Sequence, residues 1–299
     1  IGDRAFAFSS LTSIIIPDSV TTLGNNVFEY SSVEEITLPA SLESFNSNII
    51  YGCENITSIS INNGVNFAID KGSVYNSDMT VLYYHIPDAE TTEYVVPEGV
   101  KEIGDNAFYN DSYITKITLP ASLTRIGNGA LRRTALTTVV FTAGGTEALA
   151  IGEYALGDND SLTSIALPAR INAIGNNAFY DTALTSITFG GENSQLMTIG
   201  DYSFYGTSLS SVTLPSSVVS IGDYAFYRCS NLTTVTLNEG LLEIGDYAFA
   251  AQISEAYADE ADSSLETVNL PSTLTTMGDG IFAYDYALKN VNFATGSQI

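Results

Sequence analysis

Short runs of alternating apolar and polar residues repeat along the whole chain. In the run 209–214, Val212 and Leu214 alternate with Thr213, which is the period of a β-strand with one buried face. Pro215 follows, and it ends the strand because proline has no amide hydrogen to give to a sheet. The same pattern predicts strands at 11–16, 33–38, 56–61, 114–119, 136–141, 162–167, 184–189, 232–237, 265–270 and 288–293, with a shorter one at 94–96.

A second motif follows each strand and contains glycine. We expect Ile221 to return inward across the opposite side of the molecule. Gly222 suits a turn that needs a positive φ or a close approach of two backbones. Asp223 then stands where an aspartate caps a short helical turn, and that turn would carry Ala225 and Phe226 inward.

The motif Ile-Gly-x-x-Ala-Phe recurs, mostly every 22, 23 or 25 residues. It starts at Ile1, Ile103, Ile174, Ile221 and Ile244, with looser copies at Leu23, Ile126, Ile151, Ile199 and Met277. A fixed period of this length indicates a solenoid, whose units bury their apolar edges only against their neighbours. We therefore expect one continuous core and about twelve stacked parallel strands, in a body roughly 55 Å long. Residues 1–299 would form a single repeat domain with no second globular domain.

Two segments interrupt the period. In the first, about residues 62–92, apolar runs flank the polar residues 76–78, which predicts a β-hairpin insert. The second, residues 250–263, is acidic and short of core residues, so it predicts a protruding loop or short helix; function and simple loop drift both stay open for it. Both ends of the chain lie inside a repeat. We therefore expect a fragment of a longer array, with any export signal or anchor outside it.

The half-motifs Leu-x-x-Ile-x-Leu-Pro and Ile-Gly-x-x-Ala-Phe, in this order, resemble the BspA-like leucine-rich repeats, also called the Treponema pallidum type. The resemblance covers nearly the whole chain. It implies a right-handed leucine-rich-repeat solenoid with a parallel concave sheet, short strands or helical turns on the convex side, and hairpin inserts of the kind predicted above. Many members look like exported or surface proteins of bacteria and some protists, and several are associated with adhesion to host matrix proteins or other cells. No set of binding residues comes with the repeat.

Charge and hydropathy exclude several classes of function. The chain has 10 basic and 34 acidic residues, for a net charge of −24. Such a surface repels phosphate backbones and anionic membranes, so nucleic-acid binding is not expected. The sequence contains no run of 18 apolar residues, so direct membrane insertion is not expected. A solvated acidic surface is the simplest interpretation, and cationic partners or divalent ions stay open.

The residues that could support catalysis or metal binding are few. Cys53 and Cys229 share one repeat position several repeats apart, which is too far for a disulfide, so we expect two free, mostly buried thiols. His85 is the only histidine, and a lone histidine makes an ordinary strand residue more readily than a zinc site. No phosphate-binding loop or nucleophile motif occurs. We expect no enzymatic activity and no cofactor.

A ladder of carboxylates is the exception that could carry chemistry. Asp201, Asp223 and Asp246 occupy one position in adjacent units. Paired acids hydrolyse glycosides, so a carbohydrate-active solenoid enzyme is an alternative function. Stacked acids could also bind Ca²⁺, but no loop has the ligand spacing of a known calcium motif. A position that recurs this regularly favours a structural cap.

Tyrosines and threonines are the candidate ligand-binding residues. Tyr202, Tyr224 and Tyr247 follow the aspartates, and Tyr205 and Tyr227 follow Phe204 and Phe226, so each set should stack along one edge. These rings either stabilise neighbouring turns or form an aromatic strip for sugars or proteins.

A second candidate surface consists of hydroxyl groups. Thr188, Thr213 and Thr236 are expected on the solvent side of the concave sheet. They suit a weak or sugar-like ligand, although threonine also fits a solvated sheet for structural reasons alone.

The sequence as a whole favours recognition over chemistry. We expect a monomeric, non-catalytic binding or adhesion module of an exported bacterial surface protein, located outside the cell or at its surface. Its partner would be a protein or glycan of a host or neighbouring cell. A structural spacer in a surface protein is the alternative.

Overall fold

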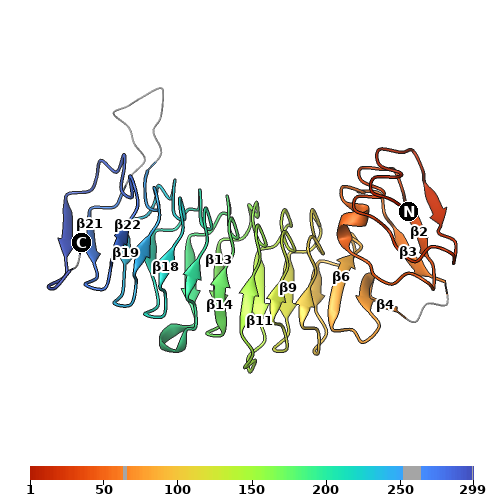
Figure 1. Ribbon diagram of the computed structural model, residues 1–299, viewed down its shortest axis with the longest axis horizontal. Helices are drawn as coiled ribbons and strands as arrows, with labels where there is room; N and C mark the ends of the chain where they lie inside the picture. Colours follow the sequence, from red (N-terminus) through yellow and green to blue (C-terminus); the bar gives the residue numbers. More distant parts are fainter. Residues whose placement is uncertain (63–65, 252–263, 298) are drawn as a thin grey trace.

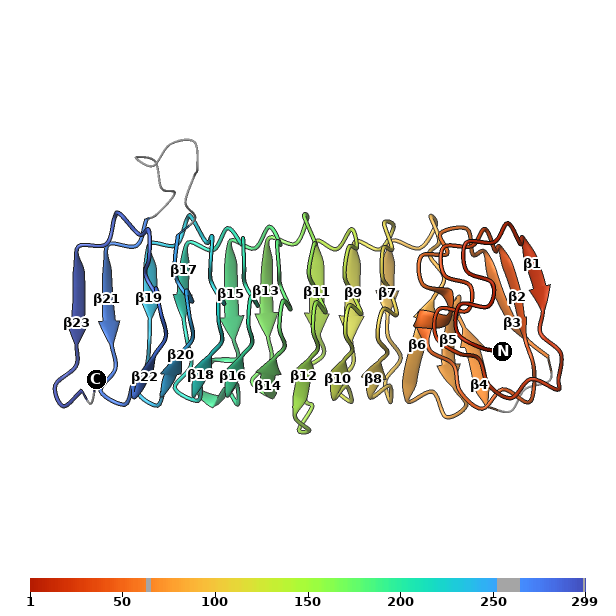
Figure 2. The same ribbon diagram turned by 45° about the horizontal axis from the view of Figure 1, so that its top comes forward.

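The computed structural model describes residues 1–62, 66–251, 264–297 and 299. It is a β-solenoid of about twelve turns, elongated along the stacking direction (Figure 1). Two rows of strands run along this body, one on each side (Figure 2). The predicted repeat solenoid with about twelve stacked strands is therefore confirmed.

One row contains the strands of the half-motif Leu-x-x-Ile-x-Leu and its variants, which we term the leucine strands. They are β1 (Ser13–Ile15), β2 (Glu35–Leu38), β3 (Ser58–Ile61), β7 (Glu93–Val95), β9 (Lys116–Leu119), β11 (Thr138–Phe141), β13 (Ser164–Leu167), β15 (Ser186–Phe189), β17 (Ser211–Thr213), β19 (Thr234–Thr236), β21 (Thr267–Leu270) and β23 (Asn290–Phe293). All pairings between them are parallel and in register, in the groups β1–β3, β7–β11, β13–β15 and β17–β23.

The other row contains short strands that end at the apolar residue before the repeated glycine, which we term the glycine strands. They are β8 (Glu102–Ile103), β10 (Arg125–Ile126), β12 (Leu149–Ile151), β14 (Ile171–Ile174), β16 (Thr198–Ile199), β18 (Ser220–Ile221), β20 (Glu243–Ile244) and β22 (Thr276–Met277). They continue as one parallel ladder. The helices in the described residues are two short 3₁₀ turns, η1 (Ser47–Ile50) and η2 (Gly191–Asn193).

Burial follows the predicted alternation. Val212 and Leu214 are buried and Thr213 between them is exposed. Leu209 is also buried, as expected, but β17 begins only at Ser211 because Leu209 packs inward from the turn that leads into the strand. Eleven of the predicted strands therefore begin two residues too early, and the one predicted at 94–96 begins one residue too late, while their inward faces are correct.

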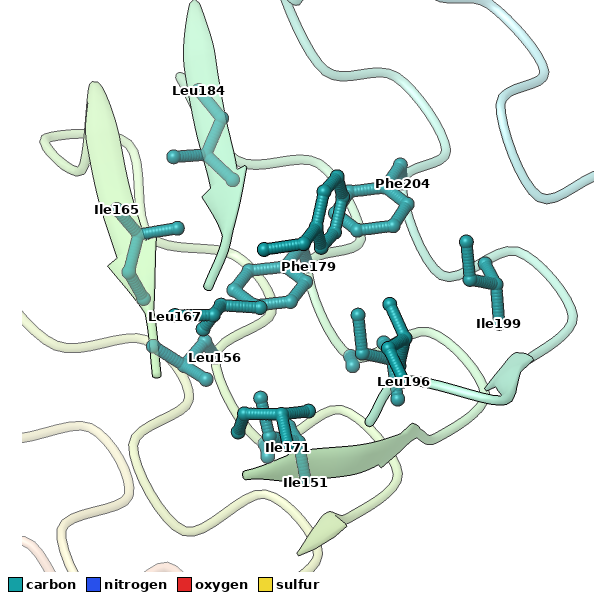
Figure 3. Packing of buried hydrophobic residues seen from close by; sticks show 14 of the residues in the cluster. Ile151, Leu156, Ile165, Leu167, Ile171, Phe179, Leu184, Leu196, Ile199 and Phe204 are labelled. Atoms are coloured by element: carbon teal, nitrogen blue, oxygen red, sulfur yellow. The ribbon is translucent and has the colours of Figure 1, made fainter. Parts of the chain in front are cut away.

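Phenylalanine rings form the centre of the core. Phe179, Phe204, Phe226 and Phe249 stack in one column with centroids 5.0 to 5.1 Å apart and nearly parallel planes. Apolar side chains from both kinds of strand surround this column (Figure 3). Burial of these side chains between turns is the main favourable contribution to stability.

The segment that carries each phenylalanine is not the helical turn that the sequence predicts. It contains two residues in the left-handed region, for example Tyr224 at φ 56° and Arg228 at φ 62°. A helix cannot continue through such residues, because right-handed helices need negative φ. Instead, backbone amides pair with the next repeat: Phe204 N donates to Ala225 O at 2.8 Å.

The aspartate after the glycine is a cap, but it caps the neighbouring turn and not a helix. Asp223 N donates to Asp201 Oδ1 at 2.9 Å, and Asp246 N donates to Asp223 Oδ1 at 2.8 Å. Asn176 takes the same role toward the amide of Asp201. Each side chain thus satisfies a backbone donor one repeat further along the chain.

The glycine is required by close approach, since Gly222 does not have a positive φ. A Cβ placed on Gly222 would lie 2.3 Å from Asp201 Oδ1 and 2.6 Å from Asp201 N. The glycines at positions 24, 127, 152, 175, 200, 245 and 278 are approached in the same way, within 2.3 to 2.8 Å. No side chain fits between turns that stack this closely.

The predicted hairpin is confirmed and is larger than expected. Three antiparallel strands, β4 (Phe67–Asp70), β5 (Ser73–Asn76) and β6 (Val81–His85), form a meander. β6 also pairs in parallel with β8, so the meander extends the sheet of glycine strands to eleven strands. It lies between the block of the first three turns and the remaining turns (Figure 1).

The meander divides the core, which was expected to be continuous. Val74 and Tyr84 belong to a cluster of buried residues with the first three turns, whereas Tyr75 and Leu82 belong to the cluster of the later turns. Both faces of β5 and β6 are therefore buried. The assignment of residues 1–299 to a single domain remains a prediction.

Three further expectations concern the inserts, the thiols and membranes. Apart from Ala250 and Ala251, which are buried, the acidic insert 250–263 lies outside the described residues. Cys53 and Cys229 are free and buried, as predicted, and burial raises the pKa of the Cys229 thiol to about 12. Within the described ranges, no helix is both long and apolar enough for a bilayer.

The close contact at the glycines predicts a position-dependent effect of one methyl group. We expect Gly222→Ala to lower the free energy of unfolding by about 1 to 3 kcal/mol, because the methyl group overlaps Asp201. Gly2→Ala is the matched control, since Gly2 has the same repeat position but nothing within 4 Å of its would-be Cβ. Chemical denaturation measures both. Equal effects of the two changes would contradict this explanation.

Candidate ligand-binding site

The five predicted tyrosines come together in one surface patch. Tyr202, Tyr224 and Tyr247 stack face to face, with centroids 4.8 and 5.1 Å apart. Tyr205 and Tyr227 form a second column at 5.5 Å. Contacts of 5.9 Å (Tyr202 to Tyr205) and 5.4 Å (Tyr224 to Tyr227) join the columns. We term these five residues the tyrosine patch.

The backbone holds the patch in place. Tyr202, Tyr224 and Tyr247 all have φ between 54° and 56°, and each donates its amide hydrogen to the carbonyl of the aspartate one turn further on. All five rings are half-buried, so one side of each column is packed and the other is open to solvent. Burial raises the pKa of Tyr202 and of Tyr227. Their hydroxyls therefore stay neutral donors at physiological pH.

A cation completes one side of the patch. Arg228 lies over the ring of Tyr205, 5.5 Å from its centroid, and donates from Nη1 to the Tyr205 hydroxyl at 3.2 Å. Such a contact orders both side chains. The patch therefore presents ordered aromatic rings, hydroxyls and one guanidinium.

The predicted threonines lie on another face. Thr188, Thr213 and Thr236 are exposed on β15, β17 and β19, and Thr213 and Thr236 are register partners. No hydrogen bond links any of the three to a residue of the tyrosine patch. Thr236 and Asn269 line a shallow hollow of about 510 Å³ beside β21. The structure thus brings the tyrosines together and leaves the threonines as a separate hydroxyl surface.

The carboxylate ladder is occupied by structural hydrogen bonds. Asp201, Asp223 and Asp246 each accept a backbone amide from the next turn through Oδ1. Across the described ranges, no three His, Cys, Asp or Glu side chains are arranged to hold a metal ion. These aspartates therefore act as caps between turns.

Sequence reasoning missed a pocket of about 440 Å³ between the third turn and the first regular turn after the meander. Its lining residues are Tyr30, Ser47, Ile50, Tyr51, Gly52, Cys53, Glu54, Tyr84, Pro87, Asn106, Tyr109, Asn110, Ser112, Tyr113 and Arg133. We term it the junction pocket. Tyr51 and Tyr109 are 58 residues apart in sequence, yet their rings lie 5.3 Å apart and their hydroxyls 3.4 Å apart. The one available signal was that both occupy the repeat position of Tyr205 and Tyr227.

Comparison with known proteins identifies the repeat. The family model described as "BspA type Leucine rich repeat region (6 copies)" matches residues 1–91, 87–198 and 197–299. The chain belongs to this family. A search of curated proteins gives no match.

Three solved structures share the fold over most of the chain. A leucine-rich repeat protein from Eubacterium ventriosum is 24% identical, with a TM-score of 0.66, over 94% of this chain and 66% of that one. A leucine-rich repeat protein from Bacteroides ovatus is 23% identical, with a TM-score of 0.58, over 96% and 74%. The pneumococcal vaccine antigen PcpA is 19% identical, with a TM-score of 0.52, over 93% and 70%. Identities this low show similarity of fold alone.

The BspA-type array also contains a buried polar cluster at the meander. His85 is a strand residue, as expected, but its Nδ1 lies 2.8 Å from Ser73 Oγ, which in turn lies 2.6 Å from the Tyr94 hydroxyl. Asp111 Oδ2 lies 3.8 Å from His85 Nε2. At most 1% of the surface of Ser73, His85 and Asp111 is exposed. These residue types occur in hydrolases, but here no substrate could reach the serine.

Burial disfavours the charged forms of His85 and Asp111. It lowers the pKa of His85 to about 4, and the nearby charge of Asp88 only partly opposes this. Burial also raises the pKa of Asp111, against hydrogen bonds from two backbone amides. Neither His85 Nε2 nor Asp111 Oδ2 has a hydrogen-bond partner among the described residues. Protonation of the buried His85 ring therefore costs free energy in the folded protein.

The pH dependence of stability follows from this shift. The unfolded chain protonates His85 as the pH falls through about 6.5, but the folded chain does so only near 4. The contribution of neutral His85 is therefore complete above pH 6.5 and is lost between pH 6.5 and 4. The loss is about 3 kcal/mol.

We expect the free energy of unfolding of the wild type, relative to His85→Gln, to fall by about this amount between pH 7.5 and 4. Guanidinium titrations at several pH values measure it. No other histidine is present, so the difference between the two proteins reports the titration of His85 together with that of Asp111, which it contacts. Parallel stability curves for the two proteins would refute the assignment.

Proposed function

We propose that the chain is a non-catalytic binding module of an exported bacterial surface protein, and that it recognises a protein or glycan on a host or neighbouring cell. The tyrosine patch carries this proposal. Five half-exposed rings are held in two columns by the hydrogen-bonded backbone of consecutive turns. Tyrosine is enriched at binding surfaces because it offers a large apolar face and a polar end with few rotatable bonds.

Preorganisation makes the patch suited to binding. The rings stack on each other at about van der Waals contact, so their orientation is set before a partner arrives. A partner then loses less conformational entropy from the surface that it covers. The acidic surroundings, with a net charge of −24 for the whole chain, favour a partner that brings basic groups.

The family and one solved relative support the proposed location. BspA-type repeats share their fold with a pneumococcal protein described as a vaccine antigen, which supports a place at the cell surface or outside the cell. The enzyme alternative has little support, because each aspartate of the ladder is already used by a backbone amide.

The binding proposal predicts one sensitive surface. In an array of extracellular-matrix proteins and glycans, we expect a partner whose affinity falls about tenfold or more when Tyr202, Tyr224 and Tyr247 are changed to Ser, because an aromatic hot spot is removed. The same three residues changed to Phe are the matched control, since the rings remain. Thermal unfolding by circular dichroism checks that each variant is folded.

Other results would redirect the proposal. A partner lost only when Thr188, Thr213 and Thr236 are changed to Ala would place the site on the hydroxyl surface. The absence of any partner for the unmodified chain would contradict binding and favour a spacer, since a spacer needs only length and rigidity.

A further inference from the structure

We propose that the junction pocket binds one neutral sugar unit of a glycan. The inference rests on the proposed function, because that function exposes this surface to glycans. The junction pocket is nevertheless a separate site that does not include the tyrosine patch. It follows from how the pocket forms, which side chains line it, and one hydroxyl that has no partner.

The pocket forms because the hydrogen-bonded stack of turns is interrupted there. Tyr30 N donates to Tyr51 O at 3.0 Å, and Phe108 N donates to Ala130 O at 2.8 Å, which is the regular pattern on either side. In the described residues, no backbone hydrogen bond joins residues 47–54 to residues 104–111. The carbonyl of Ala107, which the third turn would otherwise use, accepts from His85 N at 2.8 Å. The two turns meet instead through contacts of side chains: Ser47 Oγ donates to the backbone carbonyl of Asp105, and Asn106 Nδ2 donates to Asn48 Oδ1 at 2.9 Å.

Those side chains form a wall with both aromatic and polar parts. The rings of Tyr51 and Tyr109 pack together on one side. Tyr30 and Tyr113 line the pocket too, although 51% and 43% of their surfaces are exposed to solvent. Asn110 donates to Glu54 at 3.4 Å at the rim. Aromatic faces cover the apolar C–H faces of a sugar ring, while amide, carboxylate and hydroxyl groups bond to its hydroxyls.

Tyr84 supplies the feature that points to a ligand. Only 8% of its surface is exposed, because its ring belongs to the core of the first three turns. It nevertheless lines the pocket, and its hydroxyl bonds to none of the described residues and is not among the fully buried polar atoms that lack a partner. Tyr51 and Tyr109, by contrast, bond to each other. The Tyr84 hydroxyl is therefore open to the pocket and can donate a hydrogen bond to a ligand there.

Charge and size select the class of ligand. Glu54 and Arg133 are the charged residues among those that line the pocket, so the site is balanced overall. Arg133 is already engaged, with Asp158 at 3.3 Å and with the Tyr109 hydroxyl at 3.4 Å. A phosphate or sulfate group would find no free cation there, whereas a neutral polyol matches both the lining and the roughly 440 Å³ of space. That volume is within the usual range for small-molecule sites.

The test uses free monosaccharides and ligand-observed saturation-transfer NMR. The probes are glucose, galactose, mannose, N-acetylglucosamine and N-acetylgalactosamine, with glucuronic acid as the charged comparison. We expect at least one neutral sugar to bind, and Tyr84→Phe to weaken its affinity about three- to tenfold, which is the usual effect of one lost hydrogen bond. Tyr84→Phe keeps the buried ring and therefore the fold.

The matched control is Tyr83→Phe, which removes a hydroxyl from the adjacent residue of β6 that does not line the pocket. It should leave the affinity unchanged, whereas Tyr113→Ala should weaken it. No saturation transfer at tens of millimolar sugar would overturn the inference. So would equal binding by wild type and Tyr84→Phe, or a preference for glucuronic acid over every neutral sugar.

The outcome separates this inference from the proposed function. If a sugar binds in the pocket but the array yields no protein or glycan partner, the inference holds and the proposed function fails. If the array yields a partner that depends on the tyrosine patch and no free sugar binds, the reverse is true.

Discussion

The contact between the glycine of one turn and the aspartate or asparagine of the preceding turn is the constraint on which the rest of the molecule depends. Only a residue without a side chain lets the two backbones come this close, and the carboxylate or amide then accepts the amide hydrogen next to that glycine. The spacing of the turns is thereby set near that of strands in a sheet. Both strand ladders and both kinds of ring column follow from that spacing.

The tyrosine patch is a consequence of the same constraint. Once turns stack about 5 Å apart, any aromatic residue at a repeated position must meet its equivalents face to face. Phenylalanine at the inward position then builds the core, and tyrosine at the outward positions builds a surface. The fold and the proposed recognition surface thus use one geometry, and a change in the glycine contact would disturb both.

Sequence reasoning succeeded where the interacting residues share one repeat or one repeat position. The strand faces of Val212 and Leu214, the need for glycine at 222 and the stacking of Tyr202 on Tyr224 all follow from periodicity. It failed at the turn, because tyrosine and arginine rarely adopt positive φ and local propensity favoured a short helix. The cost of the positive φ is compensated by hydrogen bonds to the next turn, which lies more than twenty residues away in sequence.

The pocket and the buried cluster could not be predicted, because they depend on contacts that the repeat does not generate. The meander removes the regular spacing, so Tyr51 meets Tyr109 and His85 meets Asp111 across segments of unequal length. The sequence of residues 73–85 predicts a hairpin, but it does not predict that both faces of the hairpin are buried. Both faces of β5 and β6 are buried only because turns pack against the meander from two sides, and the sequence does not show that packing.

The division of the core has a mechanical consequence. In a stacked array, cooperativity depends on the coupling between neighbouring units. Along the later turns that coupling is carried by the continuous ladder of glycine strands, with ring columns over part of the array, whereas beside the third turn a few side chains and the packing of one meander take over. An axial pull on the molecule would concentrate strain at this seam. The first three turns would detach as a unit before the longer array yields, so the array has one built-in point of fracture.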